Sequence, residues 1–84
     1  MLICRVTGNI ISTRKHRLLT GSKFLVVQPI GKDESFVAVD EIGAGVNEMV
    51  LVVLGSGARN ATTHDVLPID AAIVGIIDEG TYTP

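Results

Sequence analysis

Four residues in the second half of the chain have the types that make up hydrolytic triads, namely Ser56, His64, Asp65 and Asp70. The residues around Ser56 read Leu-Gly-Ser-Gly-Ala, which lacks the Gly-x-Ser-x-Gly spacing of a nucleophile elbow. A serine, a histidine and two aspartates occur together in most chains, so the agreement is one of composition only. We therefore expect no catalytic residues and interpret the protein as not an enzyme.

Two glycine-rich segments have residue types that occur in cofactor or anion sites. Gly43-Ala-Gly-Val-Asn-Glu48 has Glu48 where the dinucleotide-binding fingerprint needs its third glycine, and the sequence has no Gly-Lys-Ser/Thr run of a phosphate loop. Gly55-Ser-Gly-Ala-Arg59 could hold an anion at a helix N-terminus, but a tight turn in which Ser56 caps a short helical turn through residue 61 explains the same residues. We expect no cofactor-binding residues and no cofactor.

Soft metal ligands are few and scattered along the chain. Cys4 is the single cysteine, and His16 and His64 lie far apart, so no cluster has metal-ligand spacing. We expect no metal site, and one cysteine excludes an intrachain disulfide. Because Cys4 lies on the apolar face of an alternating segment, we interpret it as a small buried hydrophobe rather than a reactive thiol.

Apolar runs of strand length, with no sustained helical period, indicate an all-β fold. Five strands are predicted, over residues 2–13, 24–30, 36–40, 49–54 and 71–77. Gly8 predicts a bend or bulge in the first strand, and Pro29 places the end of the second at an edge or irregularity. The continuous apolar run 49–54 predicts a strand buried on both faces. Five strands and one short helix before the last favour a small closed or partly open barrel.

A small barrel of this kind often binds single-stranded nucleic acid through stacked aromatic residues and a basic groove. The chain has three aromatic residues, of which Phe24 and Phe36 open apolar strands where core packing is expected. Its basic cluster is Arg14-Lys15-His16-Arg17. Binding of single-stranded nucleic acid is therefore kept as the alternative function. Our main expectation is that the protein has no nucleic-acid partner.

The size and charge of the chain favour association. Its 84 residues, with a net charge of −2, predict one domain over residues 1–84. A domain of this length buries only about 60–65% of the surface that its unfolded chain exposes, so its core is marginal alone. Residues 1–32 hold six basic residues and no acid (+6), whereas residues 33–84 hold one arginine and nine acids (−8). These charges either mix on a solvated surface or meet across a repeated subunit contact.

The first residues show no basic lead-in followed by a long apolar stretch, and the apolar runs are too short to span a bilayer. We therefore expect a cytoplasmic location and no membrane partner.

Seven segments occur in the order seen in one protein family. They are Ser12-Thr13-Arg14-Lys15, Leu19-Thr20-Gly21-Ser22-Lys23, Val26-Val27-Gln28-Pro29, Val37-Ala38-Val39-Asp40, Ile42-Gly43-Ala44-Gly45 with Glu48, Gly55-Ser56-Gly57-Ala58-Arg59, and the run from Pro68 to Asp78. Over about residues 1–78 the chain resembles the EutN/CcmL family, the pentameric vertex proteins of bacterial microcompartment shells, including carboxysomes. Gly57 departs from the family pattern, in which a serine is expected.

The resemblance implies an OB-like β-barrel that assembles into a homopentamer and occupies the vertices of a cytoplasmic microcompartment shell tiled by hexameric shell proteins. It places Gly43, Ala44, Gly45, Ser56 and Gly57 near subunit boundaries or the ring axis. Arg59 is the candidate for a charge-assisted contact with a neighbour, and Asp78 is a strand-end cap or interface acceptor. Arg14 and Lys15 are expected to face hexamers.

The substitution Arg59→Ala tests the proposed contact of this arginine. We expect weaker pentamers with a lower melting temperature, because a charge-assisted hydrogen bond contributes roughly 1.5–3 kcal/mol. Light scattering and thermal melting measure the two effects. Pentamers of unchanged mass and melting temperature would contradict the role given to Arg59.

Overall fold

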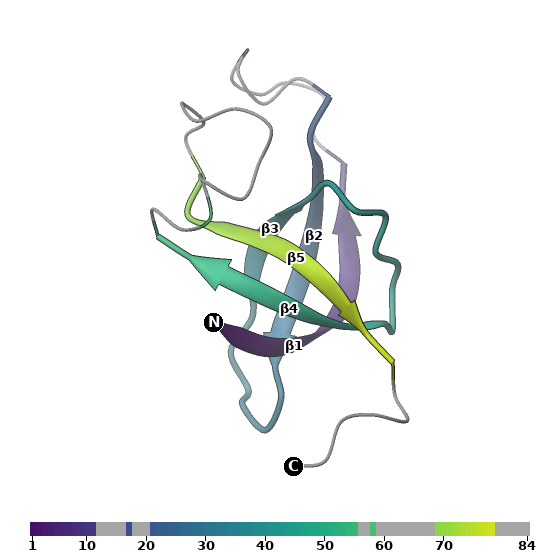
Figure 1. Cartoon of the computed structure of the whole chain (residues 1–84), viewed down its shortest axis with the longest axis vertical. Coiled ribbons are helices and arrows are strands. Elements are labelled where there is room, and N and C mark those ends of the chain that lie inside the picture. Colours follow the sequence, from purple (N-terminus) through teal and green to yellow (C-terminus); the bar gives the residue numbers. More distant parts are fainter. Residues whose placement is uncertain (12–16, 18–20, 56–57, 59–68, 79–84) are drawn as a thin grey trace.

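The computed structural model describes residues 1–11, 17, 21–55, 58 and 69–78. The five strands are β1 (Leu2–Ile10), β2 (Lys23–Pro29), β3 (Phe36–Asp40), β4 (Met49–Leu54) and β5 (Ala71–Ile77). They close into a barrel in the order β1-β2-β3-β5-β4, in which only β3 and β5 run parallel (Figure 1). The predicted all-β fold with a five-stranded barrel is therefore confirmed.

The bounds of three strands, β3, β4 and β5, agree with the prediction from the apolar runs. β2 begins and ends one residue earlier than predicted, and its last residue, Pro29, pairs with Cys4 of β1. β1 ends at Ile10 instead of continuing to residue 13. The predicted helical turn lies outside the described residues except for Ala58, whose N–H donates to the carbonyl of Gly55 at 3.1 Å.

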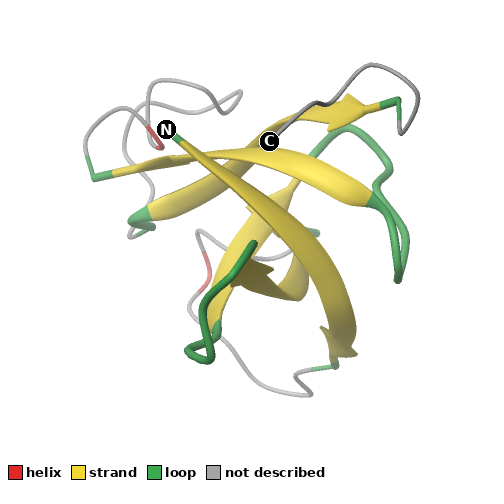
Figure 2. Ribbon diagram, turned by 90° about the horizontal axis from the view of Figure 1, so that it is seen from below, coloured by secondary structure: helices red, strands yellow, loops and turns green. Residues whose placement is uncertain are grey.

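The first strand belongs to both sides of the barrel because it bends. Leu2–Arg5 pairs with β4, whereas the longer stretch from Cys4 to Ile10 pairs with β2. The β1–β2 register shifts between Val6 and Gly8, where the predicted irregularity at Gly8 falls. A bulge adds local twist and lets one strand turn a barrel corner. Figure 2 shows the resulting curved path of β1 across the molecule.

The core is made of small and medium apolar side chains from all five strands. Its fully buried members include Leu25 and Val27 of β2 and Val50 and Val52 of β4. Cys4 is also fully buried, which confirms that it acts as a small hydrophobe, and its burial raises the pKa of its thiol. The thiol therefore stays protonated at neutral pH and is a poor nucleophile.

The prediction that β4 is buried on both faces is wrong for the single chain. Val50 and Val52 point into the core, but Leu51 and Val53 are only half-buried and Leu54 is 47% exposed. A single sheet closed into a barrel covers only its inner face, and the outer face depends on other structure for cover. The apolar run of β4 therefore gives this part of the outer surface of the barrel an apolar character.

Within the described residues, no helix is long and apolar enough to cross a membrane.

Leu25→Ala tests the importance of the barrel interior. Leu25 is fully buried, so truncation leaves a cavity and should lower the free energy of unfolding by about 2–5 kcal/mol. Urea unfolding followed by circular dichroism at a fixed protein concentration measures the change. Thr7→Ala on the exposed side of β1 is the control and should change stability by less than about 0.5 kcal/mol. Equal stability of the two variants would contradict the assigned core.

Candidate functional site

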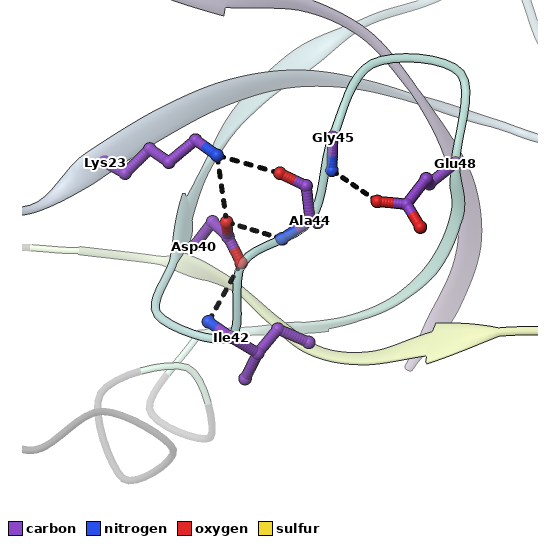
Figure 3. A network of polar contacts seen from close by, with 6 residues as sticks. All are labelled: Lys23, Asp40, Ile42, Ala44, Gly45 and Glu48. Carbon is purple, nitrogen blue, oxygen red and sulfur yellow. Dashed lines mark hydrogen bonds and ion pairs between the residues drawn. The ribbon is translucent and has the colours of Figure 1, made fainter.

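The loop between β3 and β4, residues 41–48, contains the predicted interface glycines, and the last residue of β3 organises it (Figure 3). The side chain of Asp40 is fully buried, at 0% exposure. Its Oδ1 accepts the N–H of Ile42 at 3.1 Å, and its Oδ2 accepts the N–H of Ala44 at 2.9 Å. An aspartate that accepts the N–H two residues on forms an Asx turn, which starts a tight reversal of the chain. Asp40 therefore sets the direction in which the loop leaves the barrel.

Lys23 supplies a positive charge next to this buried carboxylate. Lys23 and Asp40 are register partners on β2 and β3, and the Lys23 Nζ lies 3.6 Å from the Asp40 Oδ2. The same ammonium donates to the carbonyl of Ala44 at 2.8 Å (Figure 3). A buried carboxylate is tolerated only when charge and hydrogen bonds replace water. Here two backbone N–H groups and one half-exposed ammonium do so, and both lysine contacts hold the loop against β2.

The second half of the loop is closed by Glu48. Its Oε1 accepts the N–H of Gly45 at 2.6 Å, while the N–H of Glu48 donates to the Gly45 carbonyl at 3.1 Å. Asn47, whose φ is 75°, donates its N–H to the carbonyl of Val6 at 2.8 Å and accepts from the Arg5 guanidinium at 2.6 Å. The loop is thus fastened to β1 at one end and to β2 and β3 at the other.

The two glycines of this loop are needed for different reasons. Gly43 has φ +88°, a conformation that L side chains rarely adopt, although a Cβ there would meet open space. At Gly45 a Cβ would lie 3.3 Å from the Glu48 Oε1, so a side chain would crowd the carboxylate that its N–H binds. Ala44 is 1% exposed and packs in the barrel core. The placement of these three residues at a subunit boundary stays a prediction.

The remaining candidate residues are only partly described. Asp78 follows the last residue of β5 and is exposed. Asp70 lies just before β5, and its carbonyl accepts the N–H of Gly55 at 2.8 Å. The other candidates lie outside the described residues: Arg14, Lys15, His16, Ser56, Gly57, Arg59, His64 and Asp65. Among the described residues, no group of three or more histidine, cysteine or acidic side chains could hold a metal ion.

The Lys23–Asp40 pair was missed by the sequence reasoning. An aspartate at a strand end three residues before a glycine is a signal for an Asx turn and could have indicated Asp40. Nothing in the sequence fixes the β2–β3 register that brings Lys23 opposite it. Asp40 and Glu48 both accept hydrogen bonds from backbone N–H groups, so both carboxylates hold the backbone of the loop in one conformation.

Asp40→Asn tests this organisation of the loop. The amide removes the charge paired with Lys23 and one acceptor for the backbone N–H groups, and should cost about 2–3 kcal/mol of unfolding free energy. Lys23→Met should cost about 1 kcal/mol, because the backbone donors remain. Lys32→Met removes an equal charge without touching Asp40 and is the control in the same urea titrations. An Asn variant as stable as the wild type would contradict the role of Asp40.

Comparison with known proteins adds the family to this geometry. Residues 1–78 match the family model described as ethanolamine utilisation protein EutN/carboxysome. The carboxysome shell vertex protein CcmL of Thermosynechococcus vestitus is 51% identical over 83 residues, which cover 93% of this chain and 84% of that protein. The microcompartment shell vertex protein EutN of Salmonella typhimurium is 40% identical over 84 residues, covering 94% of this chain and 85% of that one.

Solved structures of shell proteins have a similar fold. A solved structure of the pentameric shell protein from the RMM microcompartment superposes with a TM-score of 0.89 at 39% identity, covering 100% of this chain and 98% of that chain. The similarity therefore extends through the barrel and through the loop that Asp40 organises. With nearly its whole length matched by the family model and by these relatives, the chain belongs to the EutN/CcmL family.

Proposed function

We propose that this chain is a structural shell protein whose homopentamers cap the vertices of a bacterial microcompartment. The observation that carries the proposal is the match of residues 1–78 to the family, together with relatives named as shell vertex proteins and one named as pentameric. In this proposal residues 1–84 act as one vertex domain located in the shell, inside the cytoplasm.

The surface of the barrel supports association. Several large apolar side chains are exposed in the single chain, in addition to the half-buried outer face of β4: Met1, Ile10, Ile11, Ile30, Val37, Ile42, Val46, Leu54 and Ile76. Exposed apolar side chains are removed from water when copies of a small domain associate, which stabilises the contact. A heterologous contact repeated by a rotation that closes after five copies produces a ring without leaving a free end.

The geometry of a ring of five explains its use in a shell. Hexamers tile a flat sheet, and a flat hexagonal sheet cannot close on itself. Replacing a sixfold position with a fivefold one removes a wedge and forces curvature, so a set of such positions closes the polyhedron. The partners in this proposal are therefore hexameric shell proteins, and Arg14 and Lys15 remain the candidates to face them.

This role requires shape and rigidity rather than bond chemistry, so we propose no enzymatic activity and no cofactor. The loop of residues 41–48 fits the requirement, because Asp40 and Glu48 hold its backbone through hydrogen bonds at both halves. A loop fixed in this way presents one defined surface to a neighbour. Gly43, Gly45 and Asp78 remain candidates for that surface, with Ser56, Gly57 and Arg59.

Native mass spectrometry and shell assembly together test the proposed function. We expect a stable pentamer, and we expect closed polyhedral shells in electron micrographs when the chain is co-expressed with a hexameric shell protein. Hexamers expressed alone should give open sheets or tubes, because they lack fivefold positions. A monomer that binds single-stranded oligonucleotides in a fluorescence-anisotropy titration would contradict the proposal and favour the nucleic-acid-binding alternative.

A further inference from the structure

We draw no further inference here: the strongest candidate, the apolar hollow of about 340 Å³ at the end of the barrel where β1 and β3 begin and β4 ends, carries none, because nothing in the part of the chain that the structure describes shows what covers it.

Discussion

The conformation of the loop of residues 41–48 depends on the contacts of the buried Asp40 carboxylate. Asp40 lies at the end of β3, is held by Lys23 of β2, and in turn holds the backbone at Ile42 and Ala44. From there the chain reaches Glu48, whose carbonyl accepts the N–H of Val6 on β1. The Asp40 carboxylate thus joins β3 directly to β2, and through the loop of residues 41–48 to β1, and its desolvation is offset only while that geometry persists.

Most of the fold follows from local patterns in the sequence. The runs Phe36–Asp40, Met49–Leu54 and Ala71–Ile77 are strands because they are apolar, β-branched and bounded by turn residues, and Gly8 marks the irregularity in β1. The family followed from several motifs in order, and comparison with known proteins confirmed it. The Lys23–Asp40 contact was beyond prediction, because it depends on a long-range register that no local pattern specifies.

The error made for β4 is informative about the protein as an assembly. An apolar run predicts that both faces of a strand are buried, but it does not say whether the cover comes from the same chain. In the single barrel the cover is incomplete at Leu51, Val53 and Leu54. In the proposed pentamer a neighbouring subunit would cover this face, which would explain why the outward side chains of β4 are as apolar as interior residues. The small size of the domain is consistent with this proposal, because a domain of 84 residues buries a limited share of its own surface.

The bulge in β1 has a consequence for the size of the domain. Leu2–Arg5 pairs with β4 and the stretch from Cys4 to Ile10 pairs with β2, with the register shift between Val6 and Gly8. A bulge bends its strand and adds twist. One bent strand therefore closes the sheet on both sides, and five strands are enough to complete the barrel.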